Sequence, residues 1–66
     1  MKVMVNGEER DVPDNLSVAG LLGHLGLKSD RIAIERNLEI LPRARWQDAA
    51  VQAGDRYEIV QFVGGG

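Results

Sequence analysis

The 66-residue chain contains no cysteine, so neither a disulfide framework nor a thiolate zinc site can stabilise its fold. A secreted domain of this length usually needs such a cross-link, and we therefore expect a cytoplasmic protein. Its apolar runs are too short for a signal peptide or a transmembrane helix. These absences predict a soluble chain that does not associate with membranes.

Basic residues are not in excess either, because eight lysines and arginines stand against ten aspartates and glutamates. The net charge of −2 has the wrong sign for a protein that neutralises phosphates, so we expect no nucleic-acid partner. The single histidine, His24, has no second histidine and no cysteine beside which to build a metal site or a nucleophilic relay. A chain this short also leaves little room for an enclosed active site. We expect a protein that is not an enzyme and binds neither cofactor nor metal.

The local patterns predict several strands and one helix. Val18, Leu21, Leu22 and Leu25 follow helical spacing, with Ser17 placed as N-cap and Gly26 as left-handed C-cap. Residues 43–51 are ambiguous. Alternating or β-prone residues predict extended segments at 1–5, 8–12, 31–35, 39–41 and 56–63.

This order of elements predicts an α+β fold with a mixed four- to five-stranded sheet and one helix across one face. A helical crossover allows the first and last strands to lie parallel in the centre. Asn6-Gly7 is typical of a tight hairpin, the charged segment 8–12 suits an edge strand, and a second turn is expected near Arg36-Asn37.

Strand alternation separates a core face from an open face. The core face is predicted to contain Val3, Val5, Ile32, Ile34, Tyr57 and Ile59. The opposite parity leaves Met4, Val60 and Phe62 on the side that no helix covers. Together with Val63 they would form an apolar patch for docking a partner, with Phe62 as the best anchor. Ordinary apolar surface is the alternative interpretation.

One further cluster, Arg43, Arg45 and Trp46, could bind an anion or a partner. A tryptophan packed beneath a loop, with solvated arginines beside it, is the favoured interpretation.

The sequence ends in Gly64-Gly65-Gly66, which follows the last predicted strand. Without Cβ atoms, such a tail can enter a narrow channel and present its α-carboxylate inside another protein's active site. A carboxylate is a poor electrophile and needs activation, most simply as an acyl-adenylate. A frayed terminus or a cloning remnant is the alternative. We expect residues 1–63 to form a single domain and residues 64–66 a flexible tail.

Taken in order, these motifs resemble the ubiquitin-like ThiS family, the small sulfur carriers of thiamine (thiazole) biosynthesis. The resemblance covers nearly the whole chain. It rests on Met1-Lys2-Val3, Asn6-Gly7-Glu8, Ser17-Val18-Ala19, Leu21-Leu22, residues 32–37 (IAIERN), Leu41-Pro42-Arg43 with Trp46, Gly54-Asp55, and residues 58–66 (EIVQFVGGG).

The resemblance implies a β-grasp fold and a chemical role for Gly66. An E1-like adenylyltransferase would use ATP to adenylate the Gly66 carboxylate, with Gly64 and Gly65 threading into its active site. Sulfur from a cysteine desulfurase or a related donor would then give a thiocarboxylate, which passes sulfur to thiazole synthase.

Two alternatives stay open at this point. One is a sulfur carrier of another pathway, of the type of the small subunit of molybdopterin synthase. The other is a ubiquitin-like binding module, or one that conjugates through Gly66. A thiocarboxylate rather than an isopeptide bond would separate a carrier from a conjugation module.

Overall fold

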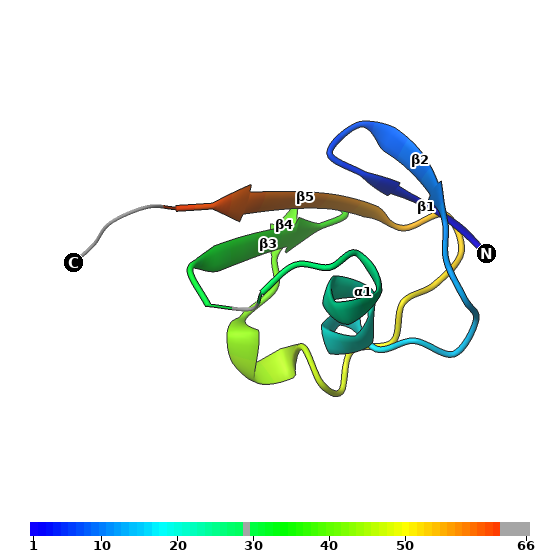
Figure 1. The fold of residues 1–66 in the computed structure, drawn as a ribbon. Helices are drawn as coiled ribbons and strands as arrows, with labels where there is room; N and C mark the ends of the chain where they lie inside the picture. The colour runs from blue at the N-terminus through cyan, green and yellow to red at the C-terminus, as the bar shows by residue number, and fades with distance from the viewer. Residues whose placement is uncertain (29, 63–66) are drawn as a thin grey trace.

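A computed structural model describes residues 1–28 and 30–62, and it places one helix against one face of a five-stranded sheet (Figure 1). The helix is α1 (Val18–His24), and a short 3-10 helix, η1 (Arg43–Arg45), follows the fourth strand. The strands are β1 (Lys2–Val5), β2 (Glu8–Asp11), β3 (Ile32–Arg36), β4 (Glu39–Ile40) and β5 (Arg56–Gln61). The predicted α+β arrangement is confirmed.

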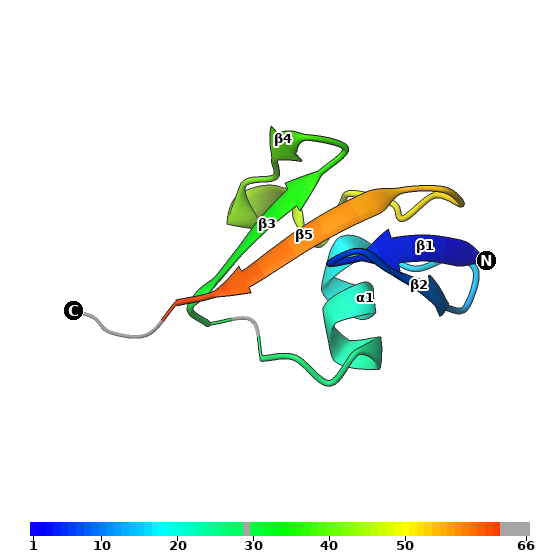
Figure 2. The ribbon, with the colours of Figure 1, turned by 90° about the horizontal axis from the view of Figure 1, so that it is seen from above.

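The sheet order is β2-β1-β5-β3-β4, with β5 in the centre (Figure 2). β1 and β5 are parallel, whereas β1 with β2, β3 with β5, and β3 with β4 are antiparallel. Parallel neighbours need a long crossover, which here includes α1. The prediction that the first and last strands lie side by side in the sheet is confirmed, and the charged β2 is an edge strand as expected.

Both hairpins turn through left-handed residues. Asn6 and Gly7 have φ of 51° and 82°, which matches the tight turn predicted between β1 and β2. Between β3 and β4 the left-handed pair is Asn37 and Leu38, with φ of 52° and 73°. This turn begins one residue later than predicted, and a leucine in this conformation has no sequence signature.

α1 begins and ends as its caps predict. The Ser17 hydroxyl accepts a hydrogen bond from the Gly20 amide at 3.0 Å, which satisfies one of the free donors of the first turn. At the other end Gly26 has φ of 75°, and the Leu27 amide donates to the Leu22 carbonyl at 2.9 Å. Gly20 and Gly23 lie within the seven residues of α1 and lower its intrinsic stability, so packing against the sheet must hold the helix in place.

The core lies between α1 and the sheet. The six strand residues predicted to face inward are all buried, as are Val18, Leu21 and Leu22 of the helix. Leu25 departs from the prediction, because it is only partly buried beyond the last turn of α1. Trp46 is also buried and donates its indole N–H to the Leu41 carbonyl at 2.9 Å. The packing interpretation of the tryptophan is thus confirmed, and the Arg43 guanidinium stacks on its ring at 4.6 Å from the centroid.

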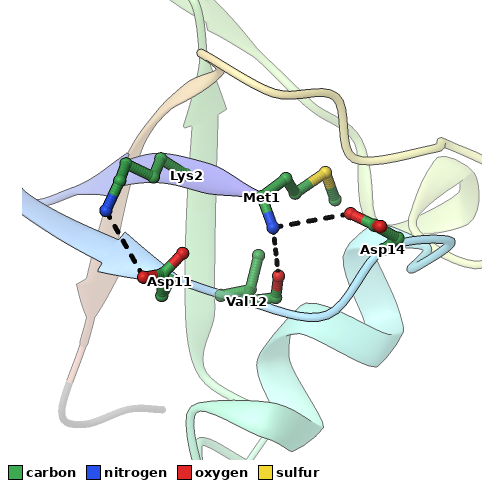
Figure 3. Close-up of polar contacts among 5 residues, drawn as sticks. All are labelled: Met1, Lys2, Asp11, Val12 and Asp14. Carbon is green, nitrogen blue, oxygen red and sulfur yellow. Dashed lines mark hydrogen bonds and ion pairs between the residues drawn. The ribbon is translucent and has the colours of Figure 1, made fainter.

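The first strand is held to the segment after β2 by polar contacts (Figure 3). The Met1 ammonium donates to the Val12 carbonyl at 2.7 Å and lies 3.4 Å from an Asp14 carboxylate oxygen. The Lys2 ammonium is 3.3 Å from the Asp11 carboxylate. The Lys2–Asp11 ion pair is exposed and contributes little to stability. The pairing of β1 with β2 is therefore held mainly by their backbone hydrogen bonds.

Candidate functional site

The predicted attachment site follows β5, and its residues Val63, Gly64, Gly65 and Gly66 lie outside the described residues. The structure shows how the chain is held up to that point. The Phe62 amide donates to the Arg31 carbonyl at 2.9 Å, so the pairing of this segment with the start of β3 continues past the end of β5. A tail that follows Phe62 would therefore leave from a firmly held part of the sheet.

An asparagine side chain supports β5 where β1 ends. Asn6 accepts a hydrogen bond from the Ile59 amide at 2.7 Å and donates to the Ile59 carbonyl at 3.1 Å. The side-chain amide of Asn6 thus provides Ile59 with the donor and acceptor that backbone groups would supply if β1 continued past Val5. This bidentate contact holds the middle of β5, three residues before Phe62.

At the start of β5, a buried carboxylate collects three donors. Asp55 is 8% exposed and accepts hydrogen bonds from the Tyr57 hydroxyl at 2.8 Å, the Gln52 amide at 2.9 Å and the Asn37 side chain at 3.2 Å. Burial raises the pKa of the Tyr57 phenol well above its usual range, and the hydrogen bond to Asp55 raises it further. Tyr57 therefore stays protonated and donates its hydrogen bond. The cluster around Asp55 fixes the turn before β5 and does not supply a catalytic base.

The predicted tail-side patch, defined as Met4, Val60, Phe62 and Val63, has three members among the described residues. Val60 is 58% exposed, Phe62 is 52% exposed, and Met4 is half-buried. In Figure 1 α1 lies below the sheet, and no helix covers the opposite face. The exposure predicted from strand alternation is confirmed, whereas docking remains a prediction.

Two apolar residues that are more exposed than Val60 and Phe62 were not predicted from the sequence. Leu38 is 92% exposed in the β3–β4 turn, and Ile40 is 77% exposed on β4. Ile40 lies opposite Glu35 in the β3–β4 ladder. Glu35 is exposed and follows the buried Ile34, so the Glu35 and Ile40 side chains share the open face. The sequence predicts an extended segment at 39–41 but assigns no face to it, because a strand of two residues is too short to show alternation.

Catalytic machinery is not found in the part of the chain that the structure describes. His24 is exposed at the end of α1, as expected. Within residues 1–28 and 30–62, no group of three or more His, Cys, Asp or Glu side chains is arranged to hold a metal ion. The same residues include no helix that is both long enough and apolar enough to cross a membrane.

Comparison with known families gives a match to the ThiS family over residues 3–66, which is nearly the whole chain. The chain belongs to the ThiS family. The predicted membership is thus confirmed, and with it the ubiquitin-like β-grasp assignment of the helix and five-stranded sheet.

Relatives of this ThiS-family chain fall into two size classes. A thiazole synthase from Paramagnetospirillum magneticum is 50% identical over all 66 residues, but the chain spans only 20% of that protein's length. The sulfur carrier protein ThiS of Bacillus subtilis is 36% identical over 53 residues, which cover 80% of each chain. A crystal structure of the thiamine biosynthesis protein ThiS from Geobacter metallireducens covers this chain completely, with a TM-score of 0.86 and 33% identity.

Proposed function

We propose that this chain carries sulfur for thiazole formation in thiamine biosynthesis, as a thiocarboxylate on the α-carboxyl carbon of Gly66. The observation that carries the proposal is the ThiS family match, which extends through residue 66. The relative of similar length from Bacillus subtilis is named as a sulfur carrier. The chain acts as a covalent co-substrate of other proteins and not as an enzyme.

The chemistry needs only a carboxylate from this chain. A Gly66 carboxylate oxygen attacks the α-phosphorus of ATP in an E1-like adenylyltransferase, and pyrophosphate leaves. The terminal sulfur of a persulfide formed by a cysteine desulfurase or a related donor then attacks the carbonyl carbon, and AMP leaves. A thiol reduces the resulting acyl disulfide, which releases the thiocarboxylate and leaves a disulfide as the oxidised product. ATP binds to the adenylating partner, so the carrier itself needs no cofactor.

The fold supplies the handle for this reaction. Gly64 and Gly65 lack Cβ atoms, so the last residues occupy the smallest possible cross-section inside a partner's channel. The chain before them is fixed by the Phe62–Arg31 hydrogen bond and the Asn6–Ile59 contacts. A fixed base followed by a thin tail would let the carboxyl group enter a partner's channel while the domain stays docked on the surface.

The tail-side patch is the proposed contact for the adenylyltransferase and for thiazole synthase. Val60 and Phe62 point away from α1 and expose about half of their surface, which a free monomer has little reason to do. Thiazole synthase is supported as a partner because a protein of that name contains a segment similar to this whole chain.

The tail proposal predicts that loading depends on a free carboxylate at Gly66 and on a tail without side chains before it. Deleting Gly66, adding one residue after it, or replacing Gly65 with Val should abolish sulfur loading. Thermal stability should stay nearly unchanged, because terminal residues of this kind bury little surface. Loading is measured with ATP, the adenylyltransferase, a desulfurase and cysteine, and His24→Ala is the loaded control. Equal loading of the extended chain would contradict the proposal.

The docking proposal predicts a loss of partner affinity without a loss of fold. Phe62→Ala should raise the KM of the chain for the adenylyltransferase about tenfold, because aromatic anchors dominate interface energy. The matched control is His24→Ala, which removes an exposed ring from the helix side. If Phe62→Ala folds and is adenylated with wild-type kinetics, the tail-side patch is ordinary surface.

A further inference from the structure

The open face of the sheet contains two carboxylates that face each other. Glu35 on β3 lies directly opposite Glu58 on β5, and both side chains are exposed. Like charges in this position destabilise a strand pair. Among residues 1–28 and 30–62, no lysine or arginine forms an ion pair with either carboxylate within 4.0 Å. The nearest cation on this face is Arg56, two residues before Glu58 on β5, which lines the same hollow without pairing with either carboxylate within 4.0 Å.

A hollow of about 350 Å³ lies at this pair, and we call it the hairpin hollow. Its lining residues are Glu35, Asn37, Leu38, Arg56 and Glu58. Leu38 is the most exposed large apolar residue described, and Ile40, directly opposite Glu35, is also exposed. Two carboxylates are thus bordered by apolar side chains that project into solvent, which is the composition of a docking surface with a charged centre.

The charge of the hollow decides what can cover it. Glu35, Glu58 and Arg56 give the hollow a net charge of −1, and an apolar partner alone would bury this excess negative charge, which is costly. A second copy of this chain would bring a hollow with the same net negative charge. A basic side chain neutralises the pair, and arginine fits best because its planar guanidinium offers several donors to two carboxylates.

The position of the hollow relative to the tail indicates which partner. Glu58, Val60 and Phe62 alternate along one face of β5, so the hollow and the tail-side patch form one strip. A protein that receives the end of the chain can therefore contact both. The relative that is a much longer thiazole synthase shows that a segment like this one occurs as part of such a protein.

We propose that the hairpin hollow is a second docking surface for thiazole synthase, in which a basic side chain of the synthase, preferably arginine, lies between Glu35 and Glu58 while Leu38 and Ile40 contact apolar side chains. The inference rests on the proposed carrier function. It adds the chemistry that the synthase must present at this position.

The test uses two double variants that change the net charge equally. Glu35→Gln with Glu58→Gln removes the facing carboxylates, whereas Glu8→Gln with Asp48→Asn removes two exposed charges on β2 and after η1. Binding of each 66-residue chain to the thiazole synthase of the same organism is titrated at two salt concentrations. We expect Kd to rise about tenfold for the first variant, with a weaker salt dependence, and less than twofold for the second.

Thermal stability separates a docking role of Glu35 and Glu58 from a purely structural one, because loss of a structural contact would lower stability and binding together. Removing the two facing like charges should raise the thermal midpoint of the free chain, so Glu35→Gln with Glu58→Gln should fold more stably while binding less tightly. Leu38→Ser with Ile40→Ser should weaken binding as well, because both exposed side chains contact the synthase. Equal Kd values for the two charge variants would overturn the proposal. Sedimentation that shows a wild-type dimer, lost in Ile40→Ser, would assign the hollow to a second copy instead.

Sulfur loading of the same variants separates this inference from the carrier function. If the wild-type chain is loaded on Gly66 but its binding to the synthase is insensitive to Glu35 and Glu58, only the hollow is assigned wrongly. If no variant and no wild-type chain is loaded, the carrier function itself fails.

Discussion

Tyr57 and Asp55 show what a single buried contact contributes at the residue scale. The Tyr57 side chain is almost fully buried, and its hydroxyl donates a hydrogen bond to Asp55 at 2.8 Å. Asp55 in turn binds the Asn37 side chain and the Gln52 amide, so one carboxylate joins the start of β5 to two loops. A proton on Tyr57 is therefore part of the fold.

The pH dependence of stability follows from this contact. Because the folded-state pKa of Tyr57 is raised above its unfolded value of 10.0, the contribution is fully present below pH 10 and is lost as the pH rises above that value. Tyr57→Phe should lower the free energy of unfolding at pH 7 by about 1–3 kcal/mol, because Asp55 loses a donor. Urea unfolding at several pH values should show the two proteins converging above pH 10. A constant difference up to pH 11 would contradict the assignment.

At the scale of elements, β5 is held by the turns of both hairpins. Asn6, in the β1–β2 turn, binds the backbone of Ile59, and Asn37, in the β3–β4 turn, accepts from the Arg56 amide at 3.0 Å. Each asparagine also has a positive φ. The same side-chain type thus supplies the turn conformation and the strand contact.

Comparing Asn6 with Asn15 separates the contribution of the turn conformation from that of the side-chain hydrogen bonds. Asn15 also has a positive φ, of 62°, but no hydrogen bond of its side chain is found among the described residues. Asn6→Ala should destabilise the protein by about 1–2 kcal/mol more than Asn15→Ala, because only Asn6 also loses two hydrogen bonds. Chemical denaturation measures both changes. Equal losses would mean that Asn6 acts through its turn conformation alone.

The elements that the sequence predicted correctly are those with local causes. Asn6-Gly7, the Ser17 cap and the Gly26 cap each act within a few residues, so their signals lie in the adjacent sequence. The β3–β4 turn was placed one residue early because Asn37 is fixed by Arg56, nineteen residues away. Residues 43–51 stayed ambiguous because Trp46 and its neighbours are positioned by α1, through the hydrogen bond from the Ala19 amide to the Trp46 carbonyl.

At the scale of the whole molecule, one face of the sheet builds the core and the other exposes apolar side chains. The exposure of Val60 and Phe62 follows from alternation and could be predicted. The facing pair of Glu35 and Glu58 could not, because it depends on the register between β3 and β5. The apolar part of the candidate site, Val60 and Phe62, could thus be predicted from the sequence. The facing carboxylates of Glu35 and Glu58 could be found only from the folded sheet.

The proposed function also assigns different roles to this chain and to its partner proteins. The described residues contain no grouping suited to a metal and expose their one histidine on the helix side. Under the proposed function, the domain contributes a surface and a chemical handle, and activation of the carboxylate takes place in a partner. The account therefore depends on a covalent change at one atom rather than on any catalytic residue of this chain.

The most direct test is the mass of the C-terminal peptide after incubation with ATP, the adenylyltransferase, a desulfurase and cysteine. The account predicts that one oxygen is replaced by sulfur, that the change maps to the peptide ending in Gly66, and that it disappears when ATP is omitted. An unmodified C-terminal peptide in the presence of active partner enzymes, or sulfur located elsewhere in the chain, would contradict it.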